Sequence, residues 1–470
     1  MARRPAEDAP ELPVFFQPRH TDETWPQPPT PAERRAAAQV RERGPECAAR
    51  TATALRDFWP SRRGTAQALR ALNRAWGTEF YRVPPEAELD AAAAREAFAG
   101  AEPVIDVQTH FAADRCLAHW NRNITAMYRM LMPDWWKGMD EIEGFSLAEY
   151  LRCVFLESET ALAVLTSAPG LGPERMLFNR ELAGTRELLE RLGAQGRLLN
   201  HCVVHPNVEG ELDAMERARD LQRPVGWKVY TLGTTGRRGY VPGSGWWLDD
   251  ERVGIPFLER ARSLGVKLIC AHKGLSALVD TGSPRDVGPV AAAFPDLDFV
   301  IYHSGYEMAL APGDPEEGAY SDATAEIGVN RLLTSLRRAG VAPGRNVYAE
   351  LGTTWFCLLK RPLEAAHVLG KLLLALGPER VVWGTDSIWY GPPQPAIDAF
   401  RAFQIPAALR ERHGYPELTR ELKAEILGRN AARVYGIDLA ALRARAERDE
   451  LAWVKAAVAE YRRSGVPSAG

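Results

Sequence analysis

The stretch PVIDVQTH, residues 103–110, decides the fold because it reads as a buried strand that ends on polar groups. Its branched apolar residues favour extended backbone, since they pack well on a pleated surface. Side chains alternate along a strand, so Asp106, Gln108 and His110 are predicted to share one face. Three polar side chains on one buried face cost free energy unless each has a partner. The stretch therefore predicts a strand with functional groups at its carboxyl end.

Downstream of this stretch, apolar strand-like runs alternate with amphipathic helical runs. The predicted strands are 103–110, 161–167, 198–205, 225–231, 266–272, 298–303, 346–351 and 380–386. Helices are predicted between them, among others at 180–193, 211–221, 323–339 and 362–376. Each strand is apolar nearly throughout, as in a parallel sheet covered on both faces. Eight such units joined by helices predict an α/β fold of the (β/α)8 TIM-barrel type.

An open doubly wound sheet is the alternative architecture. Such a sheet usually carries a glycine-rich phosphate turn after its first strand, and PVIDVQTHFAADR has none. The predicted domains are a partly irregular, mainly helical N-terminal extension (1–100), the barrel (101–440) and a C-terminal helical tail (441–470). The extension is expected to pack on the barrel rather than to form a core of its own.

Composition narrows the class of protein. The chain has 470 residues, 46% hydrophobic and 25% charged, with a net charge of -3, which is typical of a globular protein. It has no basic footprint for nucleic acid and no apolar run long enough to span a membrane. Its six cysteines are scattered and are expected to be reduced. The expected partner is a small-molecule substrate, and a homodimer is one expectation for the assembly.

The segment 61–76 resembles a twin-arginine export signal, because Ser61-Arg62-Arg63 precedes a helical run. Arg70 and Arg74 interrupt the apolar region that a working signal needs, and the segment starts far from the N-terminus. We therefore expect a surface helix there and a cytoplasmic protein.

Six polar residues stand at or near the ends of predicted strands: His110, Lys228, His272, His303, Glu350 and Asp386. In a barrel the carboxyl ends of all strands meet at one mouth, where catalysis takes place. A single histidine at a strand end is usually structural, but three of the nine histidines here share this placement with an aspartate. Imidazole and carboxylate donors suit one divalent metal ion, Zn2+ first and Mn2+ or Fe2+ as alternatives. His205 is left open between the mouth and a structural role.

Several of these motifs resemble the amidohydrolase superfamily, specifically the amidohydrolase-related branch that includes aminocarboxymuconate-semialdehyde-type decarboxylases. The resemblance covers about residues 103–437 and rests on VIDVQTH, VKLICAHKG, PDLDFVIYHSG, NVYAELG, RVVWGTDS and ILGRNAARVYGI. It implies that His110 and His272 bind the metal, and that His303 activates water or polarises the substrate. It also implies that Asp386 both binds the metal and moves a proton.

Gln108 departs from the family pattern, which usually has histidine at that position. Three interpretations remain, in order of preference. Gln108 binds the metal weakly through its amide oxygen, or it orients His110, or the site has lost its metal and only binds ligands. The residue also argues against a two-metal site.

The candidate substrate contacts are Lys228 and Glu350 near strand ends, and Arg237, Trp247 and Trp389 in the loops after the strands. Aromatic side chains suggest a flat or apolar substrate body, and basic ones suggest an acidic group on it. The predicted function is a metal-dependent hydrolase that acts on a small aromatic or carboxylate-bearing substrate with metal-activated water. A metal-dependent non-oxidative decarboxylase is the first alternative, and a non-catalytic barrel without metal is the second.

Overall fold

Eight parallel strands form the centre of the molecule. The structure is a computed structural model, and it describes residues 11–16, 21, 24, 27–116, 145–172, 175–236, 239–276, 279–308 and 317–464. The strands are β1 (Val104–Thr109), β2 (Thr160–Leu165), β3 with β4 (Leu198–Asn200 and Cys202–Val203), β5 (Trp227–Tyr230), β8 (Leu268–His272), β9 (Asp298–Tyr302), β10 (Val347–Glu350) and β11 (Val381–Val382). Each pairs in parallel with its neighbours, in the orders β1-β2-β3 and β11-β10-β9-β8-β5-β4.

Backbone hydrogen bonds close these strands into a barrel. β3 and β4 are two parts of one chain segment, interrupted at His201, and they join the two sheets. The amide of Val107 donates to the carbonyl of Trp383 (3.1 Å), so the last strand joins the first. The predicted barrel is therefore confirmed, and the open doubly wound alternative is wrong.

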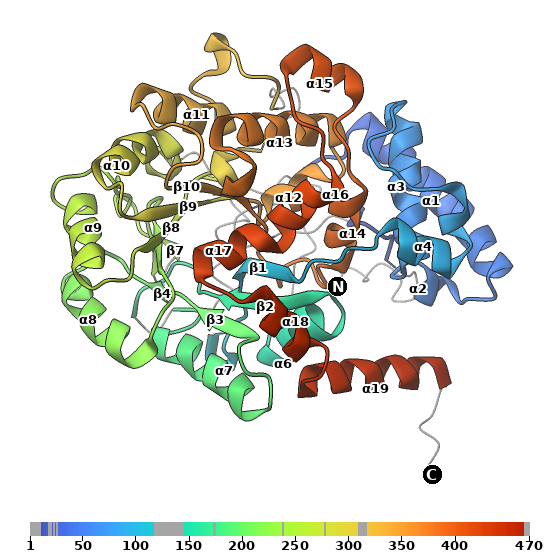
Figure 1. Cartoon of the computed structure of the whole chain (residues 1–470), viewed down its shortest axis with the longest axis horizontal. Coiled ribbons are helices and arrows are strands. Elements are labelled where there is room, and N and C mark those ends of the chain that lie inside the picture. The colour runs from blue at the N-terminus through green and yellow to red at the C-terminus, as the bar shows by residue number, and fades with distance from the viewer. Residues whose placement is uncertain are drawn as a thin grey trace, which may run out of the picture.

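Helices cover the outside of the barrel, as the alternation of patterns predicts. They include α7 (Asn179–Arg191), α8 (Glu211–Gln222), α9 (Gly254–Ser263), α10 (Val287–Ala293), α11 (Gly328–Arg338), α13 (Pro362–Leu376) and α14 (Gln394–Ala402). Figure 1 shows them as a ring around the strands. α7, α8 and α13 match their predicted ranges closely, whereas α11 begins at Gly328 and is shorter than predicted.

Several strands are shorter than predicted, and two of these differences concern predicted catalytic residues. β9 stops at Tyr302, and His303 begins a tight turn with φ 66°. β11 stops at Val382, four residues before Asp386, whose φ is 60°. Both residues thus stand on left-handed turns just beyond their strands, which aims their side chains differently from a continuing strand.

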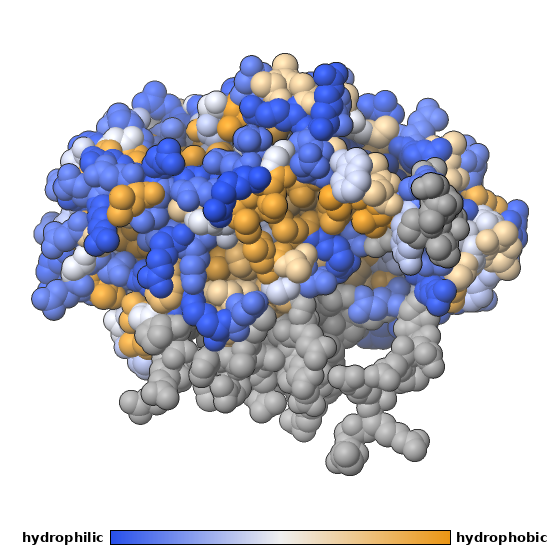
Figure 2. Space-filling model, turned by 90° about the horizontal axis from the view of Figure 1, so that it is seen from below, coloured by the Kyte–Doolittle hydropathy of each residue, from blue (hydrophilic) through white to orange (hydrophobic). Residues whose placement is uncertain are grey.

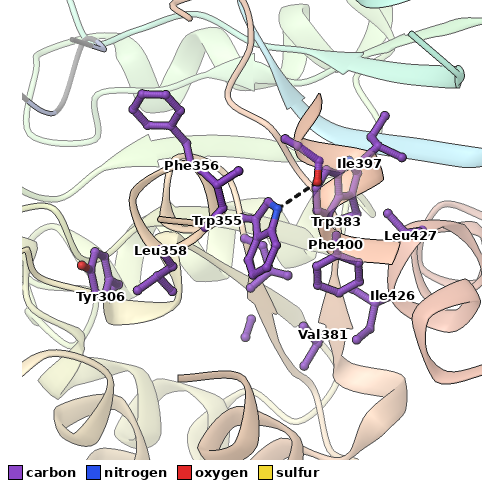
Figure 3. Close-up of a cluster of buried hydrophobic side chains, with 14 of the residues drawn as sticks. Tyr306, Trp355, Phe356, Leu358, Val381, Trp383, Ile397, Phe400, Ile426 and Leu427 are labelled. Carbon is purple, nitrogen blue, oxygen red and sulfur yellow. Dashed lines mark hydrogen bonds between the residues drawn. The ribbon is translucent and has the colours of Figure 1, made fainter. Parts of the chain in front are cut away.

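A cluster of large buried side chains fixes the short helix α12 (Thr354–Leu358), which follows β10. The Trp355 ring meets the Phe400 ring edge to face, with centroids 5.2 Å apart. Its indole nitrogen donates to the carbonyl of Ala396 (2.9 Å), as Figure 3 shows. This cluster ties the loop after β10 to the helix α14.

The N-terminal extension packs along one side of the barrel, next to α14 (Figure 1). Its helices are α1 (Pro31–Arg50), α2 (Leu55–Phe58), α3 (Arg62–Trp76) and α4 (Ala91–Ala97). The twin-arginine-like segment is the amphipathic helix α3, capped by Ser61, with Leu69 and Leu72 buried. A helix in this segment is thus confirmed, and one face of it lies against the rest of the protein.

The C-terminal part closes the amino end of the barrel and then leaves it. The helices here are α16 (Arg420–Ala424), α17 (Asn430–Tyr435), α18 (Leu439–Ala446) and α19 (Glu450–Ser464). A β-carbon on Gly428 would lie 2.0 Å from the carbonyl oxygen of Pro103, so only glycine allows this close approach to β1. The face in Figure 2 is mainly hydrophilic with an apolar area near its centre. Within the described ranges, no helix is long and apolar enough to cross a membrane.

Candidate functional site

Three polar side chains, at the end of β1 and in the turn after β11, meet at the carboxyl end of the barrel. The amide nitrogen of Gln108 donates to Oδ1 of Asp386 at 2.8 Å. Nε2 of His110 lies 2.9 Å from the same oxygen. All three side chains are fully buried. Hence Gln108 and His110, predicted to share one face of the first strand, both reach the predicted carboxylate.

The contact between His110 and Asp386 needs a cation. Nδ1 of His110 lies 3.1 Å from the carbonyl oxygen of Thr166, which can only accept, so Nδ1 carries the proton. In the neutral ring Nε2 then presents a lone pair to Oδ1, and the two atoms are not aligned as a hydrogen bond. Two electron-rich atoms repel at this distance unless a proton or a metal ion lies between them. Metal bonds of about 2.1 Å place neighbouring donor atoms roughly 3 Å apart, which agrees with this spacing.

His272 and His303 form a second pair at the same end of the barrel. Their ring centroids are 4.6 Å apart, at 61° to each other. Nδ1 of His303 lies 2.8 Å from the carbonyl of Gly352, so the neutral ring has its proton on Nδ1. In that tautomer Nε2 of His303 is a proton acceptor.

Backbone strain concentrates at this end of the barrel. His303, Ser304, Thr353 and Asp386 all have positive φ, from 51° to 66°. Such conformations cost free energy for residues other than glycine and persist where the surroundings impose them, often at functional sites. The hydroxyl of Thr353 donates to Oδ2 of Asp386, and that of Thr354 donates to the carbonyl of His303 (3.0 Å). The loop after β10 therefore holds both predicted catalytic residues.

Two further buried carboxyl groups support the loops. Glu350 accepts hydrogen bonds from the backbone amides of His303 (3.2 Å) and Gly352. Asp106 accepts from the amide and the hydroxyl of Thr385. Burial raises the pKa of Glu350 to about 8 and the pKa of Asp106 to about 7. Glu350 is therefore largely protonated at neutral pH and holds the loops after β9 and β10.

The raised pKa of Glu350 predicts a pH-dependent stability. The folded state keeps its proton up to about pH 8, while the unfolded state releases it near the ordinary value of 4.5. The folded state thus binds more protons in this window, and the free energy of unfolding falls as the pH rises, by up to about 1.4 kcal/mol per pH unit. In urea unfolding of the metal-free protein between pH 5 and 8, Glu350→Gln should remove this contribution and change the pH slope by about one proton relative to the wild type. The exposed control Glu447→Gln should leave the pH slope unchanged. Equal slopes in all three proteins would contradict the assignment of a raised pKa to Glu350.

The residues predicted to contact the substrate do not all lie at the same place in the structure. Trp389 is buried and stacks on His110, with centroids 5.8 Å apart. Lys228 is fully buried in the barrel, and its ammonium group lies 3.4 Å from the centroid of the Tyr302 ring. Trp247 faces the guanidinium group of Arg285 at 3.7 Å. Arg237 lies outside the described residues. Of these four residues, the structure thus brings Trp389 against the predicted metal ligands.

The histidine left open in the sequence, His205, is buried, and burial lowers its pKa to about 4. His201 has structural contacts: its ring nitrogens lie 3.3 Å from the hydroxyl of Tyr302 and 3.2 Å from that of Tyr435. Thr353 and the carbonyl of Thr166 were missed by the sequence analysis. A threonine after a strand and a backbone carbonyl carry no recognisable signal of their own.

How well this site can bind a metal ion depends on Gln108. Among the described residues, no group of three or more His, Cys, Asp or Glu side chains is placed to hold a metal ion. His110 and Asp386 supply two such ligands, and Gln108 occupies the third position beside them. The amide oxygen of Gln108 has no hydrogen-bond partner within the described part of the chain. The amide nitrogen of Gln108 faces Asp386, so the oxygen would reach an ion there once the amide group is flipped end for end. With that turn, two strong ligands plus this oxygen fit one divalent ion, held more weakly than by three imidazole or carboxylate ligands.

The barrel and the residues at its mouth define an α/β-barrel protein with a polar site built for cation binding or proton transfer. A sequence model of the amidohydrolase family matches residues 105–437, more than two thirds of the chain. The chain belongs to the amidohydrolase family, and the resemblance seen in the sequence is confirmed. No sequence among the curated proteins matches this chain.

Solved structures with a similar barrel include three bacterial proteins. One is 5-carboxyvanillate decarboxylase from Novosphingobium aromaticivorans with bound manganese (13% identity, TM-score 0.47, covering 72% of this chain and 98% of that one). Another is 2,6-dihydroxybenzoate decarboxylase from Rhizobium (14%, 0.41, 71% and 99%). The third is an uncharacterised TIM-barrel protein from Bordetella bronchiseptica (15%, 0.44, 74% and 100%). At these identities and TM-scores, their activities carry no argument about the reaction of this chain.

Proposed function

We propose that the chain is a metal-dependent hydrolase that acts on a small aromatic or carboxylate-bearing substrate at the carboxyl end of the barrel. The contact between Nε2 of His110 and Oδ1 of Asp386 carries this proposal, because it requires a proton or a metal ion between two buried acceptors, and its 2.9 Å spacing agrees with two ligands of one metal ion. The strained backbone of His303 and Asp386 supports it, since a vestigial site has no reason to retain that strain.

One divalent ion, Zn2+ first and Mn2+ or Fe2+ as alternatives, would be held by His110 and Asp386, with the amide oxygen of Gln108 as a weak ligand. The sequence predicted His272 as a further ligand, but among the described residues no three such side chains are placed together to hold an ion, and His272 lies against His303 instead. Such an ion, when bound, polarises a carbonyl group and makes water acidic near neutral pH. Asp386 is fixed by Thr353 and Gln108, so its carboxylate can accept the proton of the attacking water and deliver it to the leaving group.

His303 has a defined part in this scheme. Its Nδ1 proton is bound to the carbonyl of Gly352, so Nε2 accepts a proton in the neutral ring. Once protonated, the ring can stabilise negative charge that develops on the substrate oxygen. Trp389 packs on His110 and excludes water from that side of the site.

Metal content is the first test. Protein purified without a histidine tag should contain about one equivalent of divalent metal by plasma mass spectrometry. His110→Ala should lose it, and Gln108→Leu should weaken metal binding by about tenfold, while Gln108→His should hold metal at least as tightly. No metal in the wild-type protein, even after reconstitution, would refute the proposal, and equal binding by all the Gln108 variants would refute direct ligation.

The products formed will show which reaction the protein catalyses. Lactones, amides and aryl carboxylates should be screened with the metal-loaded protein, with hydrolysis products and carbon dioxide measured in parallel. Hydrolysis without carbon dioxide release is the expected result. Release of carbon dioxide from an aryl or unsaturated acid would instead make the chain a decarboxylase and would contradict the hydrolase proposal.

A further inference from the structure

A cavity of about 440 Å³ lies between the N-terminal extension and the barrel, and the residues of the candidate catalytic site do not line it. α1 and described residues before it form one wall, and α12 with Tyr306 and Met308 after β9 forms the other. Its volume is that of a small-molecule site, which is about 300–1,000 Å³. Neither the extension nor the barrel could form this cavity alone.

The charges of the described residues around the cavity are unbalanced. Among the described residues that line it, four have cationic side chains, Arg34, Arg41, Lys360 and Arg361, and one has an acidic side chain, Glu33. Glu33 lies 3.8 Å from Arg361 and accepts a hydrogen bond from the amide of Thr30 (2.6 Å), so it offsets one cation at most. The lining therefore favours an anion.

Lys360 adds a second indication. Its ammonium group donates to the carbonyl of Phe15 (2.9 Å), which anchors the extension on the barrel. Burial lowers the pKa of Lys360. A bound anion would stabilise the charged form of this side chain, so binding and charge would favour each other.

Aromatic and apolar side chains form the rest of the lining, among them Phe16, Tyr306, Met308 and Phe356. Figure 3 shows Trp355 and Phe356 leaving α12 on different sides, with Trp355 inside the hydrophobic cluster and Phe356 pointing away from it. Phe356 stacks on Tyr390, with centroids 4.4 Å apart and the planes at 11°. A flat apolar ligand body fits beside such surfaces.

We propose that this cavity is a second binding site, for a small organic anion with an apolar or aromatic body, and that the N-terminal extension supplies its guanidinium groups. The anionic group pairs with Arg34 and Arg41, and the body lies against Phe16 and Phe356. This inference does not depend on the proposed hydrolase reaction.

The walls of the cavity continue into the catalytic loops. The amide of Tyr306 donates to the carbonyl of His303 (2.8 Å). Thr353, directly before α12, donates to Asp386, and Thr354 donates to the same carbonyl of His303. A ligand in the cavity thus touches the two segments that hold His303 and Asp386, so its binding is expected to change turnover.

Calorimetric titration of the full-length protein tests the site. Benzoate and phenyl phosphate are the two anionic probes, and benzamide is the neutral control of the same shape. Wild-type protein should bind at least one anion and not benzamide; the better anion identifies the carboxylate or the phosphate as the preferred group. Arg41→Gln should weaken binding by about tenfold, and Arg34→Gln with Arg41→Gln by more. Both arginines lie on the exposed side of α1, so these variants should fold.

Two controls separate this site from the catalytic one. Arg50→Gln, an exposed change on the same helix, should bind as wild type. In Asp386→Asn, the part of the binding that Arg41→Gln removes should persist, whereas binding of a probe at the catalytic site would not depend on Arg41. Equal binding of benzamide, unchanged binding by the double arginine variant, or loss of the Arg41-dependent binding in Asp386→Asn would each overturn the inference. Absence of metal would refute the proposed function and leave this result unaffected.

Discussion

Asp386→Asn is expected to abolish turnover, lowering kcat by about 10²- to 10⁴-fold, and to lower metal affinity while the barrel stays folded. Asp386 is the side chain that Gln108, His110 and Thr353 all approach. Asparagine keeps its shape and can still hydrogen bond to Thr353. It has no negative charge to place beside His110, and its amide cannot accept a proton at neutral pH.

Three measurements decide this prediction. Metal content and kcat should fall together, while the urea midpoint of the metal-free variant should stay near that of the wild type. Asp438→Asn is a matched control, because Asp438 caps α18 at an exposed position and asparagine caps equally well. If Asp386→Asn kept its metal and a tenth of the wild-type kcat, Asp386 would not be the residue that transfers the proton.

The position of Asp386 was predictable only in part. Its place after the eighth strand followed from the alternation of strand and helix, which also located His110, His272 and His303. The left-handed turns at His303 and Asp386 did not follow, because histidine and aspartate are enriched at positive φ but neither residue type requires it. Tertiary contacts impose those turns: a hydroxyl from the loop after β10 holds each one.

Glu350 and Lys228 show a second limit of prediction from the sequence. Both residues lie near the ends of predicted strands, so the sequence predicts that they contact the substrate. In the structure, the carboxyl group of Glu350 bonds to two backbone amides, and Lys228 lies over the ring of Tyr302. Strand periodicity places a side chain inside the barrel but does not show how far along the barrel axis it lies. Their role toward substrate stays a prediction.

The extension was expected to pack on the barrel, and its contacts could not be located from the sequence. Arg62 of α3 bonds to Asp398 of α14 and to Glu159 at the start of β2. Arg401 of α14 bonds to the same Glu159 and to Glu102. These partners lie up to 336 residues apart, and only the folded barrel brings them together. The network makes the extension part of the folded unit.

Arg401→Ala is therefore expected to lower the free energy of unfolding by about 3–5 kcal/mol, the largest stability effect that we predict. The side chains of Arg401 and Glu102 are each 5% exposed, so the variant leaves a buried carboxylate without its counter-ion. It also removes the donor to the carbonyl of Phe98 in the extension (3.1 Å). The loss should appear in urea unfolding at pH 7 as a lower midpoint.

Two comparisons separate a buried-charge penalty from a general loss of packing. Arg410→Ala breaks an ion pair with Glu417 whose side chains are 28% and 45% exposed, so it should cost less than about 1 kcal/mol. The double variant Glu102→Leu with Arg401→Leu leaves neither charge buried and should recover most of the loss. If the double variant were as unstable as Arg401→Ala, packing rather than charge would explain the effect. If Arg401→Ala unfolded at the wild-type midpoint, the network would contribute nothing to holding the extension on the barrel.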